Sequence, residues 1–168
     1  MEATAGLWAS SYFVEYRGVG AETAAHFASL FYVGLMAGRF LCGFIADRLG
    51  DGRMIRIGCI GALAGLFMVL LPLPDATLSL CGLVVLGVGC APIYPSIIHS
   101  TPDHFGKRNS QAIVGIQMAS AYIGCTFMPP LFGLLAQHVD IALYPYYLLF
   151  FTVVMLIMTE LLRVKAKR

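Results

Sequence analysis

The chain has 168 residues, of which 59% are apolar and 12% are charged, with a net charge of +2 and a mean hydropathy of +0.81. An ordinary soluble domain carries about 25% charged residues, so this composition excludes a soluble enzyme domain, a disordered tail and a secreted disulfide scaffold. The small excess of cations also argues against nucleic-acid binding. Because a spanning helix takes about 20 apolar residues, the chain has room for about six of them.

Six apolar segments follow one another along the chain, and in lipid a helix is the structure that bonds all of its own backbone groups. We therefore expect an all-α membrane protein with six transmembrane helices. The first segment is short and begins abruptly, which predicts that this helix is truncated and that upstream sequence is missing. The expected helices cover residues 2–16, 23–46, 54–71, 77–98, 111–136 and 143–162.

Basic residues concentrate in alternate connections between these segments. Nine cations follow the second, fourth and sixth segments, whereas the opposite face has only Arg17. Cytoplasmic loops carry an excess of Lys and Arg, so we expect a multi-pass protein of the plasma membrane with both ends cytoplasmic. The nine cations are Arg48, Arg53, Arg56, Lys107, Arg108, Arg163, Lys165, Lys167 and Arg168.

Small residues recur at the spacing that lets membrane helices approach one another. As a signal of function this spacing is weak, because most tightly packed membrane proteins show it. The residues concerned are Gly34 and Gly38, Gly61 and Gly65, Gly82, Gly87 and Gly89, and Gly115 with Ala119.

Prolines interrupt two of the expected helices. Pro92 and Pro95 lie toward the cytoplasmic end of the fourth, and Pro129 and Pro130 lie in the outer half of the fifth. Proline removes a backbone donor and kinks a helix. Two readings stay open: these helices bend during gating, or the kinks are static and only shape the bundle.

The turn between the second and third segments carries the most informative motif. Gly43 is followed four residues later by Asp47 and Arg48, then by Gly50 and the basic residue Arg53. This pattern resembles the cytoplasmic loop signature of the major facilitator superfamily. In such a turn the aspartate faces the positive N-terminus of a neighbouring helix and the arginine pairs with carboxylates or terminal carbonyls. The loop is therefore expected to act as a gating latch on the cytoplasmic side.

The sequence departs from the superfamily pattern at one point. Asp51 and Gly52 intervene between the second glycine and the basic residue. Arg53 or Arg56 therefore supplies the positive charge of the latch, or the latch is weaker than in the superfamily pattern.

A second block, Gly87-Val88-Gly89-Cys90-Ala91-Pro92-Ile93-Tyr94-Pro95, is similar to the fucose-permease-like branch of sugar:proton symporters. The resemblance covers residues 1–168 as the C-terminal six-helix half-bundle of a twelve-helix transporter. In this superfamily substrate binds near the midplane between two halves that rock about it. The partners implied are the lipid bilayer, the absent N-terminal half or a second copy of this chain, a small polar solute and a proton.

The first helix supplies three candidate solute and proton residues. Ionisable groups inside a membrane are costly and are functional candidates by default. Glu2 is expected to bond sugar hydroxyls or to titrate as protons move. Trp8 and Tyr12 lie four residues apart on one helix face, where an aromatic ring can stack on a sugar or simply pack.

Three further polar residues lie in other helices. Arg39 either extends to the cytoplasmic face or, as we prefer, forms a structural ion pair with a carboxylate of the absent half. Gln117 and Tyr122 in the fifth helix suit an uncharged polyol as hydrogen-bonding groups, or join helices to one another.

We therefore expect a secondary transporter that works by alternating access and moves a small polar solute, such as a sugar, with protons. The alternatives are an exporter of drugs or other solutes from the same superfamily, and an inactive membrane fragment or scaffold. An intramembrane enzyme ranks last, because it would need clustered His, Glu or Asp side chains at membrane depth, where the sequence offers only Glu2 and Arg39 as ionisable groups. The cysteines and histidines are scattered, so we expect no metal site and no cofactor.

Overall fold

The computed structural model describes residues 1–71 and 76–166, without the side chains of Asp47, His104, Lys107, Arg108, Asn109, Arg163, Lys165 and Ala166. The described chain is helical with short connections and contains no strand, which confirms the expected all-α class. The helices are α1 (Glu2–Glu15), α2 (Ala21–Leu49), α3 (Asp51–Leu70), α4 (Thr77–Cys90), α5 (Ile93–His99), α6 (Thr101–Phe105), α7 (Lys107–His138), the 3₁₀ helix η1 (Ile141–Leu143) and α8 (Tyr144–Ala166).

Five segments of the described chain are long and apolar enough to cross a membrane. They are Ala21–Ala46, Asp51–Leu70, Thr77–His99, Ser110–His138 and Ile141–Leu162. The third of them combines α4 and α5. With 14 residues, α1 is shorter than a membrane span.

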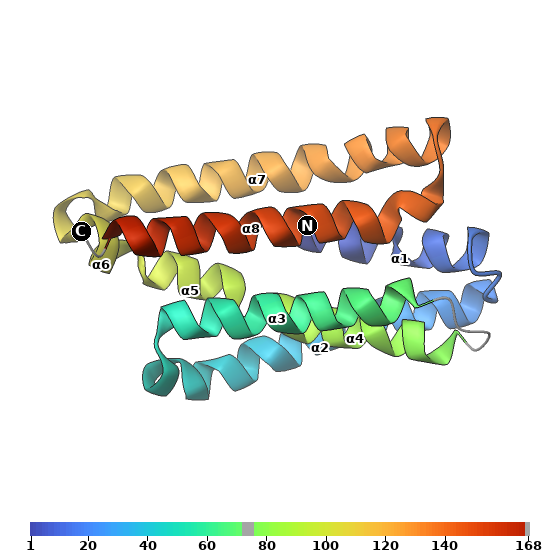
Figure 1. Cartoon of the computed structure of the whole chain (residues 1–168), viewed down its shortest axis with the longest axis horizontal. Helices are drawn as coiled ribbons and strands as arrows, with labels where there is room; N and C mark the ends of the chain where they lie inside the picture. The colour runs from blue at the N-terminus through green and yellow to red at the C-terminus, as the bar shows by residue number, and fades with distance from the viewer. Residues whose placement is uncertain (72–75, 167–168) are drawn as a thin grey trace.

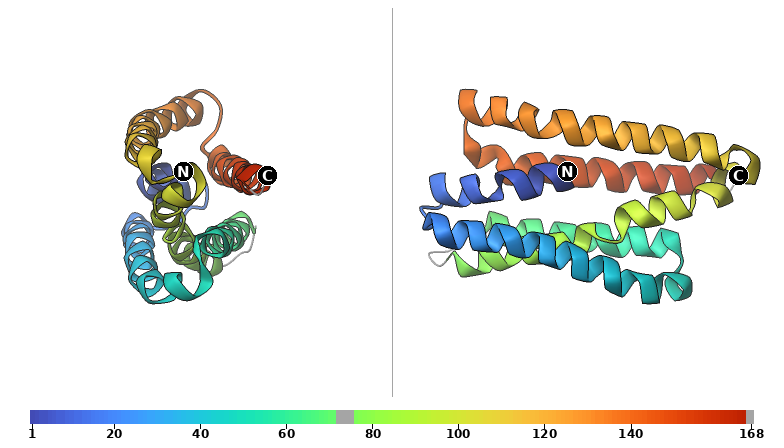
Figure 2. Two further views of the ribbon diagram at one scale, coloured as in Figure 1. Left: turned by 90° about the vertical axis from the view of Figure 1, so that its left-hand side faces the viewer. Right: turned by 180° about the vertical axis from the view of Figure 1, so that it is seen from behind.

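The long helices lie side by side along one axis (Figure 1). In the end view of Figure 2, α1 lies between α2 and α7, while α3 and α8 occupy the other side and α4 packs against α2 and α3. One end of the bundle holds the α2–α3 turn, α6 and the end of α8, and we call it the Gly50 end. The other holds the α1–α2 and α7–α8 connections, and we call it the Gly18 end.

Glycines allow α4 to pack with its backbone directly against α2 and α3. A Cβ on Gly65 of α3 would lie 2.5 Å from the backbone nitrogen of Leu86, and one on Gly34 of α2 would lie 2.7 Å from the carbonyl oxygen of Val84. These residues fulfil the role that their spacing predicts. Gly115 differs, because no atom of the described chain lies within 4 Å of a Cβ placed there.

The fourth expected helix breaks at Ala91 and Pro92, between α4 and α5. Pro92 has no N–H to continue the ladder, and its ring packs against Gly58 of α3. Pro95 lies in the first turn of α5, where its absent N–H would be unpaired in any case.

The proline pair in α7 behaves differently from the expected interruption, because α7 stays helical through Pro129 and Pro130. Side chains of two other helices bind carbonyls beside the pair. The Trp8 indole N–H donates to Pro129 O at 3.0 Å, and the Tyr147 hydroxyl donates to Met128 O at 3.2 Å. The missing N–H groups of the two prolines free the carbonyls four residues earlier, so the bonds of Trp8 and Tyr147 attach α7 to α1 and α8 and do not replace the lost backbone bonds.

The turn between α2 and α3 is much tighter than the loop expected from residue 47 to residue 53. The helix α2 runs to Leu49, α3 begins at Asp51, and Gly50 alone joins them. Its φ of +74° is a left-handed conformation that glycine adopts without strain. The backbone of Asp47 therefore lies in the last turn of α2 instead of ending the helix, and its side chain is outside the described residues.

Candidate solute site and gating contacts

An ion pair joins α1 to α2 at membrane depth. Nη2 of Arg39 lies 3.2 Å and 3.3 Å from the two carboxylate oxygens of Glu2. At 1.5 Å per residue, Arg39 lies about 10 Å inside the span that ends at Ala46, and Glu2 lies about 20 Å along α1 from Glu15. The sequence-based preference was for a partner in an N-terminal half; within this chain the partner is Glu2.

The pair belongs to a surface that we call the α1–α2 face, made of Glu2, Gly6, Tyr32, Met36 and Arg39. The three α2 residues follow a spacing of four and three, which places them on one side of the helix. A Cβ on Gly6 would overlap the ring of Tyr32, so the glycine leaves room for the tyrosine against α1.

The α1–α2 face is open, since the side chains of Arg39 and Glu2 are 47% and 36% exposed. Tyr32 is 49% exposed. Charged groups inside a membrane face a bundle interior or a water-filled cavity. Contact of this face with lipid chains is therefore unfavourable, and it requires protein or water beside it.

Trp8 and Tyr12 pack against other helices of the bundle. Besides its bond to Pro129, Trp8 makes an edge-to-face contact with Phe132, with ring centroids 5.6 Å apart. Tyr12 is 2% exposed and stacks on Tyr144 of α8 at 5.0 Å. In this structure both rings join α1 to its neighbours, and neither belongs to the α1–α2 face.

Replacing Trp8 with phenylalanine should lower the free energy of unfolding by about 1 kcal/mol. The substitution removes the N–H donor to Pro129 and keeps an aromatic ring, and a typical protein hydrogen bond contributes about that amount. Thermal unfolding in detergent measures the change. A variant as stable as the wild type would show that this bond does not hold α1 on α7.

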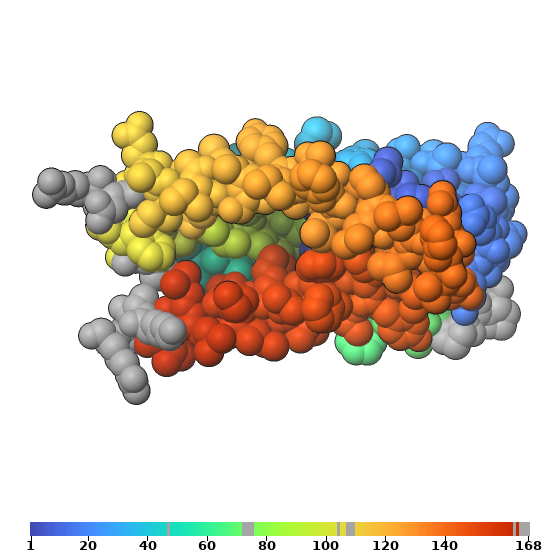
Figure 3. All heavy atoms as spheres, turned by 90° about the horizontal axis from the view of Figure 1, so that it is seen from above, coloured from blue at the N-terminus to red at the C-terminus, as the bar shows by residue number. Residues whose placement is uncertain are grey.

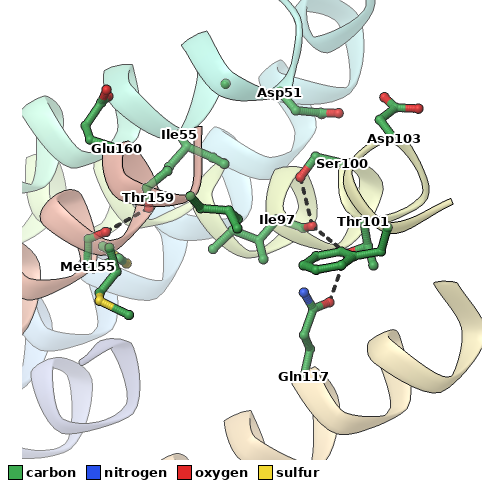
Figure 4. A pocket seen from close by; sticks show the side chains of 14 residues that line it. Asp51, Ile55, Ile97, Ser100, Thr101, Asp103, Gln117, Met155, Thr159 and Glu160 are labelled. Carbon is green, nitrogen blue, oxygen red and sulfur yellow. Dashed lines mark hydrogen bonds between the residues drawn. The ribbon is translucent and has the colours of Figure 1, made fainter. Parts of the chain in front are cut away.

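A crevice of about 520 Å³ opens at the Gly50 end. Figure 3 shows the surface hollowed between α7 and α8, and Figure 4 shows side chains from several helices around the space. Gln117 of α7 lines it, and its Oε1 lies 3.0 Å from the hydroxyl of Thr101, which lies at the same distance from Ile97 O. Gln117 thus joins α7 to α6, apart from the Glu2–Arg39 pair.

The remaining candidates divide between the bundle surface and the turn. Tyr122 of α7 is 72% exposed. Gly43, Arg48 and Arg53 are exposed at the Gly50 end, as is Gly50 itself. Of the sequence-based solute candidates, Glu2 alone is a member of the α1–α2 face.

Two side-chain contacts at the Gly50 end were not predicted from the sequence. Asp51, the residue that departs from the loop signature, lies 2.8 Å from Nδ1 of His99 and thereby connects the turn to α5. Arg56 of α3 pairs with Glu160 of α8. Partners 48 and 104 residues apart leave no local pattern in the sequence.

Arg17 joins three elements at the Gly18 end. Its Nη2 donates to the carbonyls of Val69 and Leu71 at the end of α3, and to the Ser79 hydroxyl in the first turn of α4. The single cation expected on that face therefore connects the α1–α2 turn to both helices.

Comparison with known proteins identifies one family. A family model described as Major Facilitator Superfamily matches residues 1–167. No curated protein and no solved structure matches the chain. In the part of the chain that the structure describes, no three His, Cys, Asp or Glu side chains are grouped so that they could hold a metal ion.

Proposed function

Because the chain belongs to the Major Facilitator Superfamily, a superfamily of secondary transporters, we propose that it is the C-terminal half of a transporter for a small polar solute, such as a sugar, moved together with protons. The branch similar to fucose permease is part of this proposal, as are the plasma membrane and the cytoplasmic position of both ends. The half-exposed Glu2–Arg39 pair at membrane depth is the observation that carries it.

The pair supports a transport site because its chemistry suits both cargoes. A carboxylate accepts bonds from solute hydroxyls and takes up a proton, and a guanidinium donates to solute oxygens. Substrate sites of such transporters lie near the bilayer midplane, between two halves. On this proposal the α1–α2 face lines the central cavity.

Alternating access also requires contacts that break and reform at the two ends of the bundle. The Asp51–His99 pair at the Gly50 end and the bonds of Arg17 at the Gly18 end are suited to this role, since each connects a turn to another helix. The signature loop, with Gly43, Asp47, Arg48, Gly50 and Arg53, acts as the latch beside the first of them. The break at Pro92 lets α5 move relative to α4.

Uptake by the full-length protein in proteoliposomes tests the proposal. An imposed pH gradient should drive accumulation of at least one solute from a panel of sugars, sugar acids and drugs, with solute-dependent proton flux. Glu2→Gln removes the titrating group and should abolish the response to the gradient. The control is Glu15→Gln, at the exposed end of α1, which should behave as the wild type.

Two results would contradict the proposal. The absence of solute-dependent proton flux across the whole panel would exclude proton-coupled transport. Unchanged coupling in Glu2→Gln would remove Glu2 from the mechanism.

A further inference from the structure

Arg39 has hydrogen-bond donors that Glu2 does not use. A guanidinium carries five N–H groups on three nitrogens, and both bonds to Glu2 come from Nη2 alone. Within the described chain, Nε and Nη1 of Arg39 have no hydrogen-bond partner. Because the side chain is 47% exposed on the α1–α2 face, these donors are accessible to a ligand.

Charge balance at the pair restricts what that ligand can be. Arginine stays protonated in proteins, whereas Glu2 loses its negative charge when it takes up the coupled proton. An unbalanced cation would then remain inside the membrane, which is costly. A neutral polyol leaves this charge unbalanced, but a carboxylate on the solute restores neutrality.

We infer that Arg39 binds a carboxylate group of the transported solute, and that Glu2 occupies this position on Arg39 when solute is absent. The inference rests on the proposed function and narrows its substrate class to small monocarboxylates, sugar acids among them. In the exchange, a proton bonds to a carboxylate oxygen of Glu2, Arg39 releases Glu2, and the solute carboxylate accepts hydrogen bonds from Nε and from the Nη2 that Glu2 has left. One proton and one negative charge cross together, so the cycle is electroneutral.

The surroundings of the pair contain few other charges to compensate Arg39. Besides each other, Glu2 and Arg39 have two titratable side chains as neighbours in the described chain, the thiol of Cys90 on α4 and the hydroxyl of Tyr32 on α2. Neither of these carries a fixed negative charge at neutral pH. The edge of the site offers the Tyr32 hydroxyl to a polar substituent of the solute.

Matched acids and neutral compounds test the inference in proteoliposomes containing the full-length protein. The pairs are galacturonate with galactose, and lactate with glycerol. We expect uptake or binding of at least one acid with an affinity at least about tenfold above that of its neutral partner, since losing a charge-assisted bond costs at least that factor. A potassium diffusion potential should leave acid uptake unchanged, whereas a pH gradient should drive it.

Substitutions at the pair separate recognition from coupling. Arg39→Gln should raise KM for the acid about tenfold or more, and Arg39→Lys should restore part of the affinity because it keeps the charge. Glu2→Gln should keep acid binding but lose the response to the pH gradient. Size-exclusion chromatography shows whether each variant is folded. The preference of the wild type for the acid is measured without any variant, so it tests the inference even if a variant does not fold.

Several outcomes would overturn the inference. Uptake of galactose or glycerol without their acids, or acid uptake that follows the membrane potential, would show that charge balance is not set by a solute carboxylate. An unchanged acid KM in a folded Arg39→Gln variant would exclude Arg39 from recognition. Uptake of a neutral compound without its acid would still agree with proton-coupled sugar transport. A lack of proton-coupled uptake for the broader panel would overturn the proposed function as well.

Discussion

Replacing Gly89 with valine is expected to lower the free energy of unfolding by about 3 kcal/mol, at the upper end of the usual cost of overpacking a core. A Cβ on Gly89 would lie 2.6 Å from the carbonyl carbon of Gly61 and closer still to the backbone nitrogen of Ala62. Backbone atoms of a packed helix cannot rotate away as a side chain can, so α3 and α4 must separate. Because α4 also packs on α2, the separation affects the centre of the bundle.

The matched control is Gly115→Val in α7. This substitution adds the same atoms to a membrane helix, but no described atom lies within 4 Å of the new Cβ. We expect its stability to stay within about 1 kcal/mol of the wild type, in the range of helix propensity differences. Equilibrium unfolding in mixed micelles compares the two variants. Equal stabilities would show that the close approach of α3 and α4 at Gly89 is not needed for the fold.

Much of the architecture could be predicted from the apolar segments and from the small residues within them. A run of apolar residues fixes where a helix lies, and glycines such as Gly65 and Gly89 mark where backbones meet. The exact ends of the helices could not be predicted as well from the sequence. The tight turn at Gly50 depends on a left-handed glycine that joins two helices directly, and the break at Ala91 depends on how Pro92 packs against α3.

The contacts that connect distant helices could not be read from the sequence. Arg17, Asp51 and Arg56 each bind a partner about 50 residues away or more, so that only the folded arrangement brings them together. The sequence identified Glu2 and Arg39 as charges inside the membrane but did not pair them. Their pairing follows from how α1 packs beside α2.

Helix periodicity shows which residues share a face, but it does not show whether a neighbouring helix covers that face. Tyr12 and Tyr122 illustrate this limit. Both tyrosines lie in apolar helices and were candidates for binding a solute. Tyr12 is buried beneath α8, whereas Tyr122 lies on an uncovered part of α7.

The two tyrosines therefore predict opposite results when each is replaced with alanine. Tyr12→Ala removes a buried ring that stacks on Tyr144 with an interplanar angle of 28°, and we expect it to cost about 3–5 kcal/mol, as large aromatic truncations in cores do. Tyr122→Ala removes a ring that is 72% exposed and should cost less than about 1 kcal/mol. Thermal unfolding of the two purified variants measures the difference.

Transport kinetics then distinguish a packing role from a solute-binding role for Tyr12. Tyr12→Phe keeps the ring and its stacking, so a packing residue should give a folded variant with the KM of the wild type. A residue whose hydroxyl binds solute would instead raise KM without a change in stability. If Tyr12→Ala were as stable as Tyr122→Ala, the ring of Tyr12 would not be part of the core. The sequence-based prediction that Tyr12 contacts the solute would then be the better explanation.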